Sequence, residues 1–436
     1  MKKRFAICST IVLLLLLSAC GAPQALDFSY APEGEELSSL MVETSQTHRA
    51  ELEHVPSAAD FADAISDDPA SAGLLSESEV ESLLRGHAAM ETVSKEQAQS
   101  DVSLLFRTLQ SAYGAYEYFG QEKFDAAEDA VTQWLSSQDD EIKVSALGEK
   151  LQESLAFMLA HDAHAVIYEP AAEEIEAQVR YEYFFADGFY FSKDVNGSYY
   201  MVNDGERWTL SSFSDEHVSV QPTLLQDGRI VYQPTLFALR KDAVQSSVTL
   251  KNSSGKAKIY RLDWTESQPL DVDLGTLDYR LIQEDGLTYV SLRSFVSGTY
   301  DNMLARYARE GAKARGSKAV IYDLRGNVGG SDSWPRKWIQ SFLGTQNSIE
   351  NSMLYAQKNS ALFAAENSES LLPEDEGTCF AREVHGTWYE NDIPIIVLVD
   401  DHCGSSGEGA VQLLKTLDNV LIVGSNTAGY QLCGNI

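Results

Sequence analysis

The 436-residue sequence predicts an α/β fold for its final third, preceded by a helical region and a β-rich region. From residue 288 onward, strand-like aliphatic runs alternate with amphipathic helical segments, an alternation typical of domains built on a largely parallel sheet. Between 166 and 264, short aromatic and β-branched runs alternate with Asp-Gly, Asn-Gly and Ser-Gly turns, as in antiparallel sheets. Between 94 and 160, apolar residues instead recur at helical spacing.

The first residues predict an export signal. A basic start (Lys2, Lys3, Arg4) is followed by an apolar stretch and by small residues immediately before Cys20. Leu17-Ser-Ala-Cys20 has the form of a bacterial lipoprotein cleavage box, so we expect residues 1–19 to be removed and Cys20 to be acylated. The alternative is an ordinary cleaved signal with an incidental cysteine. The protein is therefore expected outside the cytoplasm, anchored by lipid to the bacterial cell membrane.

The net charge and the cysteine content limit which partners and cofactors the protein can bind. The formal charge of −32 becomes −35 when three basic residues leave with the signal, so nucleic acid and anionic membrane surfaces would be repelled. Three cysteines remain in the mature chain, Cys379, Cys403 and Cys433, and an odd number leaves at least one unpaired. The cysteines lack the paired Cys-x-x-Cys spacing of zinc sites, and we expect no cofactor. The oligomeric state stays open.

Four regions follow the signal. Residues 20–93 are acidic and weakly periodic and are expected to form a tether with one short helix. Residues 94–165 are expected to form a helical domain, which begins with a capping box at Ser94-Lys-Glu-Gln97. Residues 166–275 form the β-rich module, and residues 276–436 the α/β domain. The expected elements of that domain are strands at 288–295, 318–324, 393–399 and 420–424 and helices at 301–314, 333–343 and 408–417.

Two motifs follow strands of the α/β domain. They are Asp323-Leu-Arg-Gly-Asn-Val-Gly-Gly330 and Ser405-Ser-Gly-Glu408. In both places an aliphatic run stops at small, turn-forming residues, which exposes backbone amides and hydroxyls at a strand end. Acyl transfer needs such groups, because a serine nucleophile requires nearby donors for the developing oxyanion.

With these motifs, residues 280–430 resemble the C-terminal processing (tail-specific) serine peptidase family. The resemblance implies a ClpP/crotonase-like catalytic domain in which Ser405 is the nucleophile. Backbone amides of Gly329 or Gly330, together with that of Ser406, are the candidate oxyanion hole. The structural alternatives are a helix N-cap at Ser405 and a tight strand-to-helix connection at the glycines.

The general base that would activate Ser405 is assigned less directly than the nucleophile. The best-known members of the family place a lysine about 25 residues after the serine, where this chain has Tyr430. A second branch, similar to the tricorn-type core peptidases, uses a histidine from an Asp-x-His segment after the helical region. His161-Asp-Ala-His164 stands at that place, so the resemblance implies His164 as the general base. A metal set of His161, Asp162 and His164 and a plain surface histidine pair are the alternatives.

The orienting acid of that branch lies well beyond the serine, and we expect it beyond Ile436, in a chain that is truncated here. Glu408 suits the helix start but is not assigned that role. Many relatives carry a PDZ-like module where the β-rich region lies, but it lacks a clear Gly-Leu-Gly-Phe-like loop. The leading hypothesis is a lipid-anchored serine endopeptidase acting on peptides or protein tails. The alternatives are a catalytically inactive peptide-binding lipoprotein of the same fold and an esterase.

Overall fold

The computed structural model describes residues 36–85, 90–167, 181–186, 188–203, 205–225, 227–239, 246–266, 279–298 and 300–431. The predicted signal peptide, Cys20 and Cys433 lie outside these residues. The chain forms two compact units, one made of residues 1–42 and 180–268 and the other of residues 43–179 and 269–436. No helix in the described part of the chain is long and apolar enough to span a membrane.

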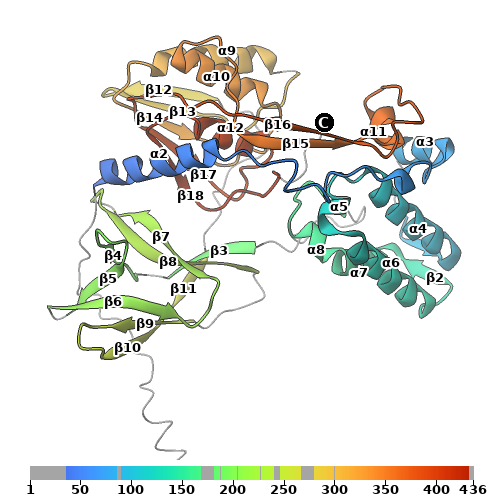
Figure 1. Cartoon of the computed structure of the whole chain (residues 1–436), viewed down its shortest axis with the longest axis horizontal. Coiled ribbons are helices and arrows are strands. Elements are labelled where there is room, and N and C mark those ends of the chain that lie inside the picture. The colour runs from blue at the N-terminus through green and yellow to red at the C-terminus, as the bar shows by residue number, and fades with distance from the viewer. Residues whose placement is uncertain are drawn as a thin grey trace, which may run out of the picture. The chain divides into compact units, whose positions relative to one another are not determined.

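The first unit contains an antiparallel β module (Figure 1). One sheet has the order β10-β9-β6-β5-β4 and the other β11-β3-β8-β7. The strands are β3 (Tyr181–Ala186), β4 (Ser192–Lys193), β5 (Tyr199–Asn203), β6 (Glu206–Phe213), β7 (Val218–Leu224), β8 (Ile230–Leu239), β9 (Ser247–Lys251), β10 (Ala257–Arg261) and β11 (Trp264–Glu266). Phe191, Trp208 and Leu250 fill the core, because alternate residues of each strand face inward.

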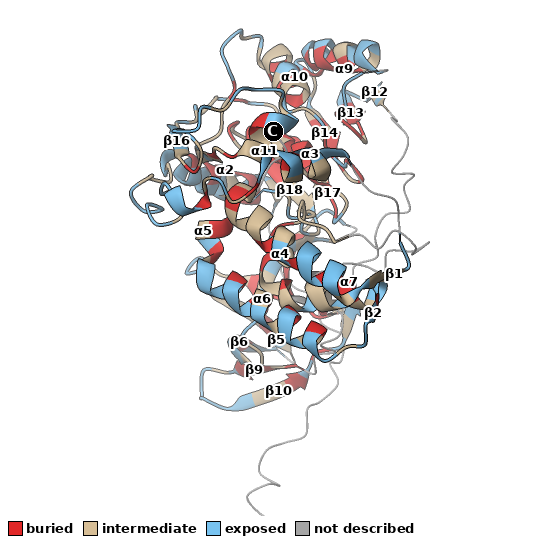
Figure 2. Ribbon diagram, turned by 90° about the vertical axis from the view of Figure 1, so that its right-hand side faces the viewer, coloured by how far each residue is buried: buried red, intermediate tan, exposed pale blue. Residues whose placement is uncertain are grey.

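The second unit begins with short helices around one apolar core. They are α4 (Lys95–Ala112), α5 (Tyr116–Phe119), α6 (Gln121–Ser136), α7 (Val144–Ser154) and α8 (Ala156–Leu159), with a small sheet of β1 (Thr92–Ser94) and β2 (Glu141–Lys143). The Ser94 hydroxyl accepts the Gln97 N–H at 3.1 Å, which confirms the predicted cap. In Figure 2 the helices α4 and α6 are buried on one face and exposed on the other, and Phe106, Phe124 and Leu135 lie in the core between them.

The stretch expected as a tether is more ordered than predicted. It contains α2 (Leu37–Glu53), the 3₁₀ turn η1 (Pro69–Ser71) and α3 (Glu77–Arg85). Asn419 N–H donates to Ser45 Oγ at 2.9 Å, and Cys379 N–H donates to Asp67 Oδ1 at 2.7 Å. The acidic, weakly periodic composition of the stretch hid these helices from sequence analysis, although Leu40, Met41 and Leu52 of α2 and Val80 of α3 are buried.

The α/β domain contains a five-stranded sheet in the order β12-β13-β14-β17-β18, in which only β12 is antiparallel. Its elements are β12 (Arg280–Glu284), β13 (Leu287–Ser291), α9 (Asp301–Ala314), β14 (Ala319–Asp323), α10 (Ser333–Leu343), β17 (Ile395–Val399), α12 (Ser406–Leu414) and β18 (Val420–Gly424). Figure 1 shows α9 and α10 beside each other above the sheet. This arrangement confirms the predicted α/β class and reproduces the predicted helices at 301–314 and 333–343.

A long hairpin that the sequence did not predict leaves the α/β domain. It consists of β15 (Met353–Lys358) and β16 (Cys379–Val384), with α11 (Ala361–Glu366) between them. Figure 1 shows the hairpin running toward α3 and α5. Lys358 is buried at its far end, where Nζ donates to Gln110 O at 2.7 Å and to Glu117 Oε1 at 2.5 Å. The hairpin therefore attaches the helical region to the α/β domain.

Candidate active site

Ser405 occupies a sharp turn between β17 and α12. Its backbone has φ +51° and ψ −122°, a conformation that residues other than glycine rarely adopt. Ser405 precedes the first residue of α12, yet its side chain accepts no capping hydrogen bond. Within the described residues the hydroxyl has no hydrogen-bond partner, so the side chain does not act as the N-cap that the structural alternative required.

The neighbouring Ser406 ties the helix to the glycine-rich loop. Its hydroxyl donates to Gly330 O at 2.7 Å, so this side chain is already engaged and Ser405 is the free hydroxyl of the pair. The backbone N–H of Ser406 belongs to the first turn of α12, where such groups lack acceptors inside the helix. Neither it nor the N–H of Gly330 has an acceptor in the described part of the chain, so both can serve an oxyanion.

Gly329 differs from Gly330. Its N–H donates to Asn327 Oδ1 at 3.0 Å, so in this conformation it is not a free oxyanion donor. Gly329 instead allows close approach, since a Cβ atom there would lie 2.6 Å from the Ser405 Cβ and its φ is +101°. Of the two predicted glycine donors, the geometry leaves Gly330 available and gives Gly329 a steric role.

Asn327 was missed by sequence analysis and organises the loop. It is fully buried, and its side-chain amide donates to Leu292 O at 2.8 Å. Its own carbonyl accepts the Gly404 N–H at 2.9 Å, which joins the glycine-rich loop to the turn before Ser405. Its place within the Asp323–Gly330 motif was the available signal, but nothing in the sequence shows that its oxygen takes up the Gly329 N–H.

Asp323 and Arg325 form a structural pair within the glycine-rich loop. Two Arg325 nitrogens donate to the Asp323 carboxylate at 2.9 Å each, and Tyr289 Oη donates at 2.7 Å. Burial alone would raise the pKa of Asp323, but the hydrogen bonds from Arg325, Arg293 and Tyr289 outweigh it and hold that pKa well below its usual range. A carboxylate this strongly engaged shapes the loop and does not take up protons during a reaction.

Cys403 lies two residues before Ser405 and is an alternative nucleophile to consider. Its side chain is fully buried, and no disulfide involves it within the described residues. Burial, with the nearby Glu408 and Asp400 carboxylates, raises the pKa of the Cys403 thiol well above its usual range. The nucleophilic form of cysteine is the thiolate, so this thiol is not poised for attack.

Glu408 is buried in the first turn of α12 and holds the segment after β18. Its carboxylate accepts the Gly429 N–H at 2.7 Å and the Tyr430 N–H at 2.8 Å. This is a structural role, distinct from that of an acid that orients the base. It places Tyr430 beside the turn that carries Ser405.

The structure brings His164 to the same side of the domain as Ser405. Its ring packs against Tyr430 with centroids 4.5 Å apart, and Tyr430 in turn contacts Gly404. Within the described residues no hydrogen bond joins His164 to Ser405. The Nδ1 atom of His164 is buried and has no partner there either, so the imidazole is not held by an acid.

The metal interpretation of His161, Asp162 and His164 is not supported by their contacts. Asp162 Oδ1 accepts the His164 N–H at 3.0 Å and Asp162 Oδ2 accepts Tyr113 Oη at 2.8 Å, so both carboxylate oxygens are occupied by protein donors. In the part of the chain that the structure describes, the only grouping with metal-ligand geometry is Asp400, Asp401 and His402.

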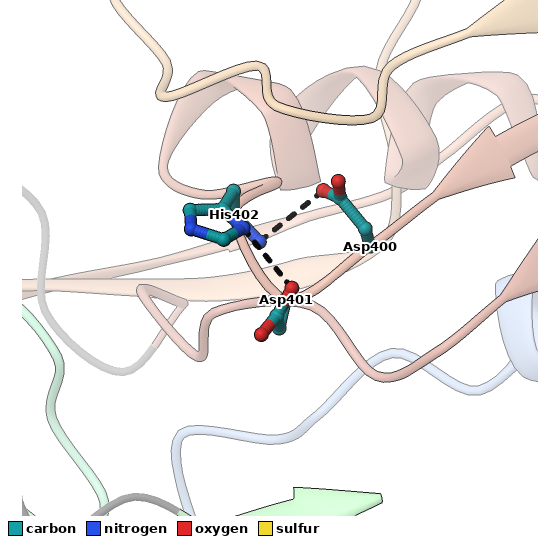
Figure 3. Close-up of side chains that lie close together, drawn as sticks. All are labelled: Asp400, Asp401 and His402. Carbon is teal, nitrogen blue, oxygen red and sulfur yellow. Dashed lines mark hydrogen bonds and ion pairs between the residues drawn. The ribbon is translucent and has the colours of Figure 1, made fainter. Parts of the chain in front are cut away.

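Figure 3 shows this second group at the end of β17. His402 Nδ1 lies 3.1 Å from Asp401 Oδ1, and the His402 N–H donates to Asp400 Oδ1 at 3.2 Å. Asp400 Oδ1 also accepts the Gly326 N–H at 2.8 Å. These bonds give Asp400 a structural role between the two loops of the site.

Comparison with known proteins agrees with this geometry. The family model of peptidase family S41 matches residues 286–435. No protein with a curated description matches the chain in sequence.

Solved structures are similar at low sequence identity. Mature CPAF complexed with lactacystin is 14% identical, with 77% of this chain and 85% of that chain covered and a TM-score of 0.31. The photosystem II D1 C-terminal processing protease is 13% identical, with 77% and 82% covered and a TM-score of 0.30. A lipoprotein from Streptococcus agalactiae is 14% identical, with 79% and 80% covered and a TM-score of 0.29.

The family match covers every strand of the sheet except β12 and includes both motifs, with Ser405 and the glycine-rich loop. A free serine hydroxyl at a strained strand-to-helix turn, with two unengaged backbone N–H groups beside it, suits acyl transfer. Residues 286–435 are therefore similar to the domain of peptidase family S41, and this match supports a serine-type peptidase.

Proposed function

We propose that this chain is a lipid-anchored, extracytoplasmic serine endopeptidase that cleaves peptides or protein tails through an acyl-enzyme, with Ser405 as nucleophile and His164 as general base. Ser405 and both glycines lie within the matched family domain, and His164 lies outside it. The resemblance to the histidine-dependent branch supports His164, because this chain has Tyr430 where other members have the lysine base.

In the proposed acylation, the Ser405 hydroxyl attacks the scissile carbonyl carbon while His164 accepts the hydroxyl proton. The tetrahedral intermediate then collapses, the peptide C–N bond breaks, and His164 returns the proton to the leaving amine. Water, deprotonated by His164, attacks the ester in the second half-reaction. This releases the acid product and restores the Ser405 hydroxyl.

A tetrahedral intermediate forms in acylation and again in hydrolysis of the ester, and in each its oxyanion carries a full negative charge. The N–H groups of Gly330 and Ser406 are the donors that we assign to it, since each lacks an acceptor within the described residues. Losing one such donor typically lowers the rate by about 10²–10³-fold. Gly329 contributes by leaving space, because any side chain there would collide with Ser405.

The single observation that carries this proposal is the backbone of Ser405. A φ of +51° in a non-glycine residue, at the exact residue that the family motif assigns as nucleophile, is a cost that a plain helix cap does not require. Within the described residues, the same turn leaves the hydroxyl without a hydrogen bond.

Hydrolysis of fluorescently labelled casein tests the proposal. We expect Ser405→Ala to lower the rate by about 10⁴-fold or more and His164→Ala by about 10²-fold or more. Matched controls are Ser368→Ala, an exposed serine that also has positive φ, and His385→Ala, an exposed histidine; both should retain the wild-type rate. Equal turnover by wild type and Ser405→Ala would refute the nucleophile assignment.

A second candidate is a catalytically inactive peptide-binding lipoprotein. The observations that favour it are the missing hydrogen bond between Ser405 and His164 within the described residues and the tyrosine at position 430. It predicts no turnover of any peptide, with an affinity that neither Ser405→Ala nor His164→Ala changes. Calorimetric titration with a peptide library, run beside the casein assay, separates the two candidates.

The lipid anchor and the location outside the cytoplasm rest on the sequence around Cys20. Cells that express the chain and are fed radioactive palmitate should label the wild type, and Cys20→Ser should abolish the label. Equal labelling of both forms would show that the lipid is not on Cys20.

A further inference from the structure

The segment 428–431, which we call the bridging segment, lies between the turn of Ser405 and the segment of His164. At its start, the Ala428 N–H donates to Cys403 O at 2.9 Å. In its middle, Gly429 O accepts the Ala163 N–H at 3.4 Å. The backbone of the bridging segment thus bonds to Ala163, which precedes His164, and to Cys403, which lies two residues before Ser405.

Glu408 fixes the bridging segment on the helix that follows the nucleophile. Its two carboxylate oxygens accept the N–H groups of Gly429 and Tyr430, at 2.7 and 2.8 Å. Because Glu408 is three residues after Ser405 on a buried face of α12, these two bonds set the position of Tyr430 relative to the nucleophile. Charge-assisted bonds of this kind are among the stronger ones in proteins.

The Tyr430 ring packs against Gly404 on one side and against His164 on the other. Toward the nucleophile, a Cβ atom at Gly404 would lie 2.7 Å from Tyr430 Cδ2, so the ring packs directly on this glycine. Toward the base, the Tyr430 and His164 rings meet edge to face, with centroids 4.5 Å apart and planes at 76°. The ring therefore lies beside the residue before Ser405 and against the imidazole.

The imidazole has little else to orient it. Its Nδ1 is buried without a hydrogen-bond partner in the described part of the chain, whereas histidine bases are commonly oriented by an acceptor at the second nitrogen. The neighbouring carboxylate of Asp162 is occupied by the His164 backbone N–H and by Tyr113 Oη. Within the described residues, packing against Tyr430 is thus the side-chain contact seen to orient the His164 ring.

We propose that Tyr430 is a positioning residue for His164, which it orients toward Ser405 through ring contact while Glu408 holds its backbone. This inference rests on the proposed function, since it presupposes that His164 is the base. It also gives the tyrosine at the lysine position a role of its own. The aromatic ring carries that role, and the phenolic hydroxyl is not needed for it.

The competing idea is that Tyr430 blocks the path between His164 and Ser405. The two ideas predict opposite effects of shortening the side chain. A blocking ring would make Tyr430→Ala faster than wild type, whereas a positioning ring makes it slower.

The test is the rate at which a fluorophosphonate probe labels the full chain, measured from pH 5 to 9. We expect Tyr430→Phe to stay within about twofold of wild type with an unchanged pH profile. Tyr430→Ala should be at least about tenfold slower with an altered profile, because the base is misplaced. In the His164→Ala background, Tyr430→Ala should cause no further loss. Faster labelling by Tyr430→Ala, or the same loss with and without His164, would overturn the inference.

Two controls separate this inference from the proposed function. If Ser405→Ala labels as fast as wild type, or His164→Ala has no effect, the proposed function fails at the nucleophile or the base. If both behave as expected and Tyr430→Ala equals wild type, only the inference fails. Imidazole NMR signals of His164 give a readout independent of turnover: they should broaden or split in Tyr430→Ala and match wild type in Tyr430→Phe. Unchanged signals in Tyr430→Ala would also overturn the inference.

Discussion

The backbone of Ser405 stores strain at the residue on which the proposed chemistry depends. Positive φ in a residue with a Cβ atom costs about 1–2 kcal/mol and persists only when the surrounding structure enforces it. Here the enforcing contacts are the hydrogen bond from the Gly404 N–H to Asn327 O and the one from the Ser406 hydroxyl to Gly330 O. In this conformation the hydroxyl makes no capping hydrogen bond to the helix backbone.

This strain predicts a difference between two inactive variants. Ser405→Gly should be more stable than Ser405→Ala by about 1 kcal/mol, because glycine adopts positive φ without steric cost. Urea unfolding of both proteins, followed by tryptophan fluorescence, measures the difference. An alanine variant at least as stable as the glycine variant would mean that the turn is not strained.

At the scale of residues, the sequence located Ser405, Ser406 and Gly330 after the ends of two strands, and the structure brings the two loops together, while their catalytic roles stay predictions. It did not predict that Asn327 takes up the Gly329 N–H or that Tyr430 packs on His164. Both depend on which groups meet across loops, and side-chain partners in loops have no periodic signal in the sequence.

Among the elements, strong hydrophobic periodicity was what made prediction possible. Helices α9 and α10 match their predicted ranges because each has one apolar face on the sheet. The hairpin of β15 and β16 was missed because its residues are mostly half-buried or exposed and do not alternate cleanly. Helix α2 was missed because its sequence is polar and acidic.

Substitution of Lys358 tests how much the attachment of the hairpin contributes to the free energy of unfolding. Lys358→Met should lower the free energy of unfolding by about 3 kcal/mol, because it leaves the partly buried Glu117 carboxylate without its cation. The exposed Lys318→Met is the control and should change stability by less than about 0.5 kcal/mol. Chemical denaturation measures both. Equal stability of the two variants would show that the buried ion pair does not hold the hairpin in place.

Because His48 lies in α2 and has a lowered pKa, we expect the stability of the folded protein to depend on pH. Burial, followed by the nearby Lys415 cation, lowers the pKa of His48 from 6.5 to about 4, against a smaller opposing effect of Glu51. The folded state therefore binds fewer protons than the unfolded state between pH 6.5 and 4, so stability is present above pH 6.5 and is lost as the pH falls through this window. The loss between pH 6.5 and 5 should be about 2 kcal/mol.

Thermal or urea unfolding at pH 6.5 and pH 5 checks this value. His48→Asn cannot titrate, so wild type should lose about 2 kcal/mol more than this variant over the interval. His385→Asn, which replaces an exposed histidine, should behave like wild type. A loss in His48→Asn as large as that in wild type would assign the pH dependence to other groups.

At the scale of the second unit, the central question is how His164 and Ser405 come together from distant parts of the sequence. The hairpin attaches the helical region through Lys358, and the bridging segment joins the two sides next to the site. Sequence periodicity predicts neither link, because both are tertiary contacts. The pairing of His164 with Ser405 was available beforehand only through the family resemblance.

The most direct test of the account is to map the adduct left by a fluorophosphonate probe. After labelling of the full chain at pH 7.5 and proteolytic digestion, mass spectrometry should find the probe on Ser405, with little or none in His164→Ala. Labelling of Ser406 or Cys403 in place of Ser405, or an equal amount of Ser405 adduct in wild type and His164→Ala, would contradict the proposed pairing.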